Sequence, residues 1–206
     1  MSGAGHWDAV YGGKPDDSLS WFEAAPGLSA ELFAAHLRPG AAVDVGAGAS
    51  RLVDHLLDKG FAPIAALDIA AEGLAVTRAR LGSRAAAVDW VVGDVTAWTP
   101  PRRYGLWHDR AVFHFLTDPA SRAAYARVLD AATAPGAVAI IATFAEDGPE
   151  KCSGLTVQRY APADLAAELE AHLPGVFTPV ENRRHLHVTP AGREQRFQFS
   201  VLRKAE

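Results

Sequence analysis

Short apolar runs alternate with segments of helical periodicity along most of the chain. Five of these runs have the length and apolar content of buried strands, and they cover residues 41–45, 62–68, 88–94, 104–109 and 137–144. After the first run, Leu52, Val53 and Leu56 recur at the spacing of one helix face, and Gly60 follows as a helix-ending residue. Repeated strand–helix units of this kind predict a doubly wound, mostly parallel sheet.

Further helices are marked by the residues that begin or end them. Asp118 is expected to cap a helix whose first residue is Pro119, and Pro135-Gly136 to end it. Gly82 is expected to end an earlier helix.

The C-terminal segment has a different pattern. "HLHVTPAGREQRFQFSVL" alternates in polarity on both sides of a turn, and Pro190 and Gly192 occupy favoured places of a β-turn that begins at Thr189. This pattern predicts an antiparallel hairpin that closes the sheet. We see no linker inside the chain and expect residues 1–206 to form a single domain.

Composition excludes some classes of protein. The 206 residues are 49% hydrophobic with a formal net charge of −4, and no basic face is built, which argues against a nucleic-acid partner. Cys152 is the only cysteine, so an intrachain disulfide is excluded. We find no secretory signal and no apolar run that could span a membrane, and therefore expect a cytoplasmic protein without a membrane partner. The oligomeric state stays open.

Candidate ligand-binding residues stand at the ends of three successive strands. The first strand ends in "DVGAGAS", where Gly46 and Gly48 permit a tight turn, but Arg51 stands where a dinucleotide-binding fingerprint has its third glycine. Asp68 ends the second strand and suits two ribose hydroxyls, and Asp94 follows the third, placed for an adenine amino group. Each aspartate alone has a simpler interpretation as a turn or helix cap.

The three motifs together resemble those of class I S-adenosylmethionine (SAM) dependent methyltransferases. "DVGAGAS", "ALDI" and "VVGDV" are similar to that family's first, second and third motifs. The resemblance implies a Rossmann-like methyltransferase fold with seven strands and SAM as cofactor. It also implies a set of cofactor-binding residues, namely Tyr11, Trp21, Asp44, Gly46, Ala47, Gly48, Ser50, Asp68, Ile69, Asp94 and Val95.

A narrower resemblance concerns small enzymes of this class that include protein-lysine methyltransferases, one of which modifies citrate synthase. The shared features are "SWF" at 20–22 and an aspartate followed by a basic residue after the fourth strand. That group has Asp-Lys-Gly where this chain has Asp109-Arg110-Ala111, and the departure weakens the case for a lysine acceptor.

The stretch "LWHDRAVFHFL", residues 106–116, places ionisable groups after the fourth strand, beside the expected methyl group. His108, Asp109, Arg110 and His114 are therefore the candidate catalytic residues. We expect a short helix from Arg110, with Arg110 and His114 on one face. Either histidine could be a general base, although a structural role is favoured for each one alone; Asp109 could instead cap the helix.

A metal site is not expected. His108 and Asp109 would point to opposite faces of a strand, and His185 and His187, which share a face, have no evident third ligand.

Two segments are expected to cover the site. Residues 145–160 have no clear periodicity and leave the carboxyl edge of the sheet, which indicates a lid loop. Residues 1–27 are aromatic-rich and are expected to form an N-terminal flap, with packing against the sheet edge as the alternative.

The sequence therefore predicts methyl transfer from SAM to a small polar acceptor by direct displacement, and Arg110 favours an acidic one. The alternative is a protein-lysine N-methyltransferase. A nicotinamide-dependent reductase fits less well because of Arg51 and the third acidic residue, Asp94. A nucleotide-binding module fits less well because it would not need the polar cluster at 108–114.

Overall fold

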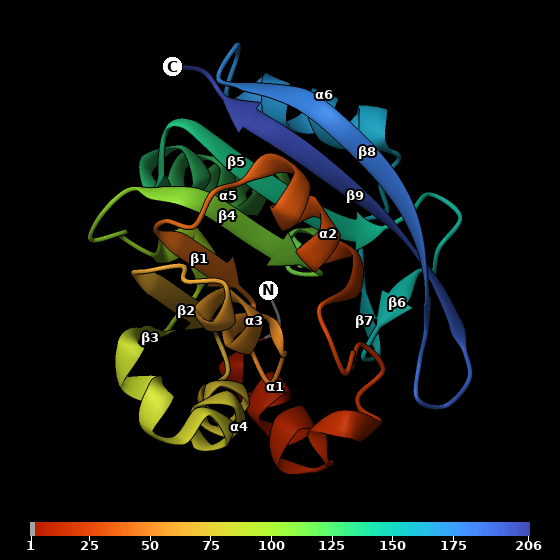
Figure 1. Ribbon diagram of the computed structural model, residues 1–206. Coiled ribbons are helices and arrows are strands. Elements are labelled where there is room, and N and C mark those ends of the chain that lie inside the picture. Colours follow the sequence, from red (N-terminus) through yellow and green to blue (C-terminus); the bar gives the residue numbers. More distant parts are fainter. Residues whose placement is uncertain (1–2) are drawn as a thin grey trace.

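A seven-stranded sheet forms the centre of the structure, a computed structural model that describes residues 3–206 (Figure 1). Its strands are β1 (Ala42–Val45), β2 (Ile64–Asp68), β3 (Val88–Val92), β4 (Tyr104–Arg110), β5 (Thr133–Phe144), β8 (Phe177–Val188) and β9 (Glu194–Lys204). They lie in the order β3-β2-β1-β4-β5-β9-β8. Strands β1 to β5 pair in parallel, whereas β9 is antiparallel to both β5 and β8, so the predicted fold class is confirmed.

Helices cover both faces of this sheet (Figure 1). The helices α2 (Gly27–His36), α3 (Leu52–Asp58) and α4 (Ala71–Leu81) contribute to one apolar core, and α5 (Pro119–Ala132) and α6 (Pro162–His172) to the other. Alternate residues of a strand serve opposite cores: on β4, Leu106 belongs to the first and Trp107 to the second. His108 and Asp109 therefore point to opposite faces, as the sequence predicted.

Several predicted element ends are confirmed. The Asp118 carboxylate caps α5 by accepting a hydrogen bond from the Ser121 amide at 2.8 Å, with Pro119 as the first helical residue. The Gly192 amide donates to the Thr189 carbonyl at 2.8 Å and closes the β8–β9 hairpin. One boundary was wrong: β5 begins directly after α5, at Thr133, ahead of the Pro135-Gly136 pair.

The expected helix from Arg110 does not form. Strand β4 continues to Arg110, and the Ala111 amide still donates to the Ala142 carbonyl of β5 at 2.8 Å. Ala111 then adopts a left-handed φ of 73°, and only a short 3-10 turn, η4 (Phe113–Phe115), follows. Pairing with β5 prevails over local helical spacing here, so Arg110 and His114 share no helix face.

The segment 145–160 is more regular than its sequence suggested. It contains a small hairpin of β6 (Lys151–Cys152) and β7 (Leu155–Thr156) with Ser153 and Gly154 at the turn. Strands of two residues are too short to give a period, which explains why the pattern was missed.

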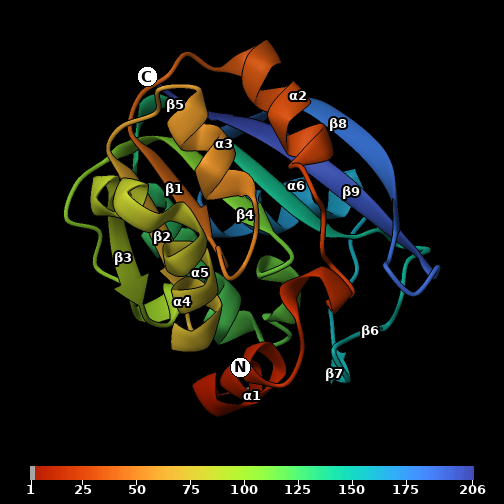
Figure 2. The ribbon, with the colours of Figure 1, turned by 60° about the horizontal axis from the view of Figure 1, so that its bottom comes forward.

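The N-terminal segment also has structure of its own. It forms α1 (Ala4–Gly12) and a 3-10 turn, η1 (Asp16–Ser18), and then runs to α2; the first two residues of the expected 1–27 flap lie outside the described part. Figures 1 and 2 show this segment beside β6 and β7 at one end of the sheet. Among residues 3–206 there is no helix with the length and apolarity needed to cross a membrane.

Candidate active site

Two adjoining cavities open at the carboxyl ends of β1 to β4. The larger encloses about 850 Å³ including its mouth, and the smaller about 610 Å³. Asp68, Ile69, Asp94 and Val95 line the larger one, and Asp44, Ala47, Ser50 and His108 the smaller. Tyr11, Trp21, Gly46 and Arg110 line both. Most of the residues singled out in the sequence thus meet in one continuous space.

The glycine turn after β1 needs its glycines. Gly46 has φ 70° and Gly48 φ 42°, both in the left-handed region. A Cβ on Gly46 would lie 2.2 Å from a Val112 methyl carbon, and one on Gly48 2.1 Å from the Tyr11 hydroxyl oxygen. Gly48 therefore lies directly beneath Tyr11, and its lack of a side chain lets the N-terminal segment close onto the turn.

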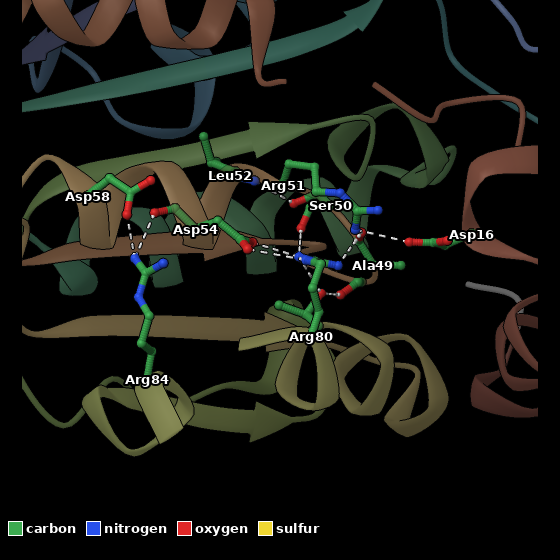
Figure 3. Close-up of polar contacts among 11 residues, drawn as sticks. Asp16, Ala49, Ser50, Arg51, Leu52, Asp54, Asp58, Arg80 and Arg84 are labelled. Carbon is green, nitrogen blue, oxygen red and sulfur yellow. Dashed lines mark hydrogen bonds and ion pairs between the residues drawn. The ribbon is translucent and has the colours of Figure 1, made fainter. Parts of the chain in front are cut away.

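Polar contacts from α4 and the N-terminal segment hold this turn (Figure 3). The Arg80 guanidinium donates to the Ala49 and Ser50 carbonyls at 3.2 and 2.6 Å, and pairs with Asp54 at 2.7 Å. Arg51 pairs with Asp16 at 2.9 Å. Arg51, which departs from the dinucleotide-binding fingerprint, thus ties the turn to η1.

Asp68 joins the glycine turn to the start of α4. Its carboxylate accepts hydrogen bonds from the Gly48 amide at 2.9 Å and the Ala70 amide at 2.7 Å. Burial raises the pKa of Asp68 from 3.8 to about 6, and the two amide hydrogen bonds oppose that shift. The same carboxylate therefore orders the turn and lines the larger cavity.

This raised pKa predicts a pH-dependent affinity for SAM. Folding raises the pKa of Asp68, so this group makes the unliganded fold less stable as the pH rises from about 4 to about 6. If Asp68 holds the ribose of SAM, as the sequence resemblance implies, the ribose needs the ionised acceptor, and the affinity for SAM should fall, by up to about tenfold per pH unit, below about pH 6. Titration calorimetry at several pH values measures this. Asp68→Asn, which does not titrate, should bind weakly with a flatter profile, and an equally steep profile in that variant would contradict the assignment.

Asp94 has the capping role that was its simpler interpretation. One carboxylate oxygen accepts from the Thr96 amide at 2.8 Å and from the Thr96 hydroxyl at 2.7 Å, at the start of η3 (Val95–Ala97). Asp94 and Val95 nevertheless line the larger cavity, so the cap fixes a carboxylate that still faces it.

Asp44 lines the smaller cavity and belongs to a buried chain of polar side chains. His108 Nδ1 lies 2.9 Å from one Asp44 oxygen, and His108 Nε2 lies 2.9 Å from the Ser29 hydroxyl. The other Asp44 oxygen, Oδ2, is buried and has no hydrogen-bond partner among residues 3–206. A buried carboxylate oxygen without a donor fits a positively charged amino group, which is what the methionine end of SAM carries.

Two candidate catalytic residues lie outside these cavities. Asp109 is fully buried on the opposite face of β4, where it accepts from the Val112 amide at 2.8 Å and the Tyr125 hydroxyl at 2.7 Å. The helix that Asp109 was expected to cap does not form; its carboxylate instead accepts from the Val112 and Phe113 amides that lead into η4, where Val112 holds the cap position. His114 is also fully buried, and its Nδ1 accepts from the Phe144 amide at 3.2 Å. Burial and the Arg110 charge lower the pKa of His114 to about 3, which favours a structural role over a general base.

A cluster of charged and polar groups surrounds Glu23, which sequence reasoning missed. Its carboxylate lies 3.1 Å from Arg110, 3.5 Å from His185 and 3.6 Å from His187. Hydrogen bonds from the two histidines and the Arg110 charge hold the pKa of Glu23 well below its usual range, against burial. Glu23 stands in an irregular connection without a motif, so no signal could have found it.

Glu23 is the third potential metal ligand beside His185 and His187, which the sequence did not reveal. Glu23, His185 and His187 place their ligand atoms within 4.8 Å of one another. The Arg110 guanidinium already supplies a positive charge to the carboxylate, so the arrangement is that of an ion cluster. It ties down the N-terminal segment, because Arg110 donates to the Trp21 carbonyl at 3.0 Å and His187 Nε2 lies 2.8 Å from the Ser20 carbonyl oxygen.

Aromatic side chains from four elements and a connecting segment line part of the larger cavity. They are Trp7, Trp21, Phe115, Phe144 and Phe197. We call this region the aromatic chamber. Cys152 also lines it, and burial raises the pKa of its thiol to about 12. Phe115 lies in the η4 turn that replaces the expected helix, and it lines this cavity.

Both segments that were expected to cover the site contribute residues to the wall of the larger cavity. Tyr11 and Trp21 come from the N-terminal segment, and Cys152 comes from the β6–β7 hairpin.

We expect bound ligands to order these two segments, so amides in residues 3–19 and 145–160 should exchange several-fold more slowly with SAM and acceptor bound. Hydrogen exchange on free and loaded protein measures this. Amides of the central β1 strand are the internal reference, and equal exchange of both segments in the two states would contradict a covering role.

Comparisons with known proteins agree with this geometry. Residues 42–136 match the family model of a methyltransferase domain. No curated protein matches the sequence significantly. The matched residues run from β1 to the start of β5 and include the glycine turn, Asp68 and Asp94.

Solved structures share the whole fold. A protein studied for the conversion of a disulfide bond into a thioacetal group during echinomycin biosynthesis has a TM-score of 0.77 at 23% identity, over 98% of this chain and 93% of that one. The Burkholderia thailandensis 1,6-didemethyltoxoflavin-N1-methyltransferase, solved with its substrate and S-adenosylhomocysteine, has a TM-score of 0.70 at 25% identity, over 89% and 80%. The N-methyltransferase NodS from Bradyrhizobium japonicum WM9, solved with S-adenosylhomocysteine, has a TM-score of 0.71 at 12% identity, over 97% and 98%.

Proposed function

Because the chain is a class I SAM-dependent methyltransferase, we propose that it methylates a small polar molecule held in the aromatic chamber. The observation that carries this proposal is the position of Arg110, which lines both cavities. The Arg110 guanidinium lies 5.2 Å from the centroid of the Phe197 ring, which lines the larger cavity, and 3.1 Å from Glu23, which lines the smaller one. Among the described residues that line both cavities, Arg110 alone carries a charge.

The cofactor compartment offers a matching partner for each part of SAM. Asp44 Oδ2 is placed for the amino group, the Asp68 carboxylate for the ribose hydroxyls, and Asp94 with Val95 for the adenine. Gly46 and Gly48 keep the turn free of side chains. When bound, SAM supplies an electrophilic methyl group on a sulfonium. These assignments support a cofactor position with its methyl end toward Arg110.

The remaining task of the chain is to align the acceptor and to exclude water. Positioning of this kind can contribute about 7–11 kcal/mol to a displacement reaction. Trp21 and Phe115 close the chamber, and Arg110 can orient an electronegative group of the acceptor. Arg110 is already paired with Glu23, which supports a polar acceptor better than a fully acidic one.

A protein lysine remains the alternative acceptor. An ammonium group in the chamber would lie beside Arg110, and the carboxylates that line the larger cavity, Asp68 and Asp94, belong to the cofactor compartment. This arrangement favours the small molecule.

Incubation with SAM labelled on its methyl group separates the two acceptors. We expect label in the small-molecule fraction when a metabolite extract is added, and none in protein when a protein extract is added. Label in a lysine side chain would contradict the proposal. Thermal melts check the cofactor independently: S-adenosylhomocysteine at about 100 times its Kd should stabilise the fold by roughly 2.7 kcal/mol, and NAD should not.

A further inference from the structure

Two groups of aromatic rings line the aromatic chamber. Trp7 meets Trp21 and Phe115 edge to face, with ring centroids 5.9 and 5.1 Å apart. Phe144 and Phe197 meet at 4.8 Å on the side formed by β5 and β9. Rings arranged in this way offer both faces and edges to a ligand. A flat molecule that stacks on them fits these walls better than a branched or strongly hydrated one.

Arg110 supplies a polar group at the edge of this chamber. Its guanidinium carbon lies 5.2 Å from the centroid of the Phe197 ring. Its Nε–H is buried and has no hydrogen-bond partner among residues 3–206, although the NH1 group donates to the Trp21 carbonyl. A buried donor without a partner is unfavourable, and more so when the group is charged. A carbonyl oxygen or ring heteroatom on the ligand would satisfy it.

The described walls of the larger cavity hold no general base for an acceptor. Asp68 and Asp94 belong to the cofactor compartment, and Cys152 stays a neutral thiol because burial raises its pKa to about 12. Burial also raises the pKa of the Tyr11 hydroxyl, so it stays protonated. His114 is a weak base and lies behind the wall. The acceptor must therefore present a free lone pair without first losing a proton.

From these three observations we infer that the acceptor is a flat, uncharged heteroaromatic molecule with a ring-nitrogen nucleophile and a second electronegative group for Arg110. The inference rests on the proposed function. The nitrogen lone pair forms the new N–C bond, the sulfur keeps the electron pair of the broken S–C bond, and the positive charge passes to the methylated ring. No proton is released, so no base is needed. The surrounding rings stabilise the cationic product by cation–π contacts.

Four probes of different chemistry test this inference on protein saturated with S-adenosylhomocysteine. Nicotinamide is flat and uncharged, with a ring nitrogen and a carbonyl; piperidine-3-carboxamide is its puckered, cationic analogue. Benzoate represents an acidic acceptor and lysine amide a lysine. Calorimetry should show nicotinamide binding at least tenfold more tightly than each of the others, and labelled SAM should methylate it alone. Tighter binding of any other probe, or binding of none, would overturn the inference.

Two variants link the binding to the chamber. Phe115→Leu removes a wall ring and should weaken nicotinamide binding about tenfold, while affinity for S-adenosylhomocysteine stays within a few-fold. Phe177→Leu makes the same substitution at a buried ring of β8 that lines neither cavity, and should change neither affinity. Equal losses in both variants would show a general destabilisation and contradict the inference. Failure of S-adenosylhomocysteine itself to bind would overturn the proposed function, which separates the two outcomes.

Discussion

Asp68→Ala is expected to lower the affinity for SAM by about 10²–10⁴-fold. Hydrogen bonds to a charged group contribute about 1.5–3 kcal/mol each, and two ribose hydroxyls would lose such a partner. Because a factor of ten in affinity corresponds to about 1.4 kcal/mol, losing two such hydrogen bonds lowers the affinity by about 10²–10⁴-fold. The same change leaves the Gly48 and Ala70 amides without their acceptor, so the bare protein should also become less stable by about 1–3 kcal/mol.

Titration calorimetry with S-adenosylhomocysteine measures the affinity, and thermal melts of the bare variant measure the stability. Asp89→Ala is the matched control, because Asp89 is a partly exposed aspartate of β3 whose carboxylate pairs with Arg102 at 3.6 Å. It should bind like the parent protein. An Asp68→Ala protein that folds and binds within a few-fold of the parent would remove Asp68 from the cofactor site.

Arg110→Gln is expected to lower methyl transfer on the order of 10²-fold while the affinity for S-adenosylhomocysteine stays within a few-fold. The side chain faces the chamber and orders the Trp21 backbone, and small misplacements of an acceptor are sufficient for losses of this size. Turnover is measured with the acceptor that the labelled-SAM incubation identifies. The thermal stability of the unliganded variant is measured as well, because the substitution removes the guanidinium that pairs with the Glu23 carboxylate at 3.1 Å.

His114→Asn is the comparison for this variant. An asparagine oxygen can replace Nδ1 as acceptor for the Phe144 amide, so folding should be retained, and a residue behind the wall should leave turnover within a few-fold. Equal turnover in Arg110→Gln and the parent would show that Arg110 only holds the flap. Loss of cofactor affinity in Arg110→Gln would instead assign Arg110 to SAM. A 10²-fold loss in His114→Asn would restore the histidine as a catalytic candidate.

The parallel sheet and the position of Asp68 and Asp94 at one cavity were predictable because local pattern decides them. Each strand is a short apolar run, and the rule that ligands bind at carboxyl strand ends brings Asp68 and Asp94 together without knowledge of side-chain contacts. The glycine turn was predictable for the same reason, because Gly46 and Gly48 directly follow the β1 strand in sequence.

The acceptor end was less predictable because long-range pairing decides it. Pairing of β4 with β5 carries the backbone through Arg110 into the left-handed Ala111, which cancels the helix that the spacing of Arg110 and His114 suggested. Glu23 reaches Arg110 from a segment 87 positions earlier, and Phe144 and Phe197 come from adjacent antiparallel strands far apart in sequence. No periodicity of 2 or 3.6 residues records such contacts.

A crystal structure with S-adenosylhomocysteine would show directly how the cofactor is held. We expect its ribose hydroxyls on the Asp68 carboxylate, its amino group on Asp44 Oδ2, and its sulfur at the mouth of the aromatic chamber beside Arg110. A ligand whose sulfur points away from the chamber, or whose ribose does not contact Asp68, would contradict the proposed cofactor site.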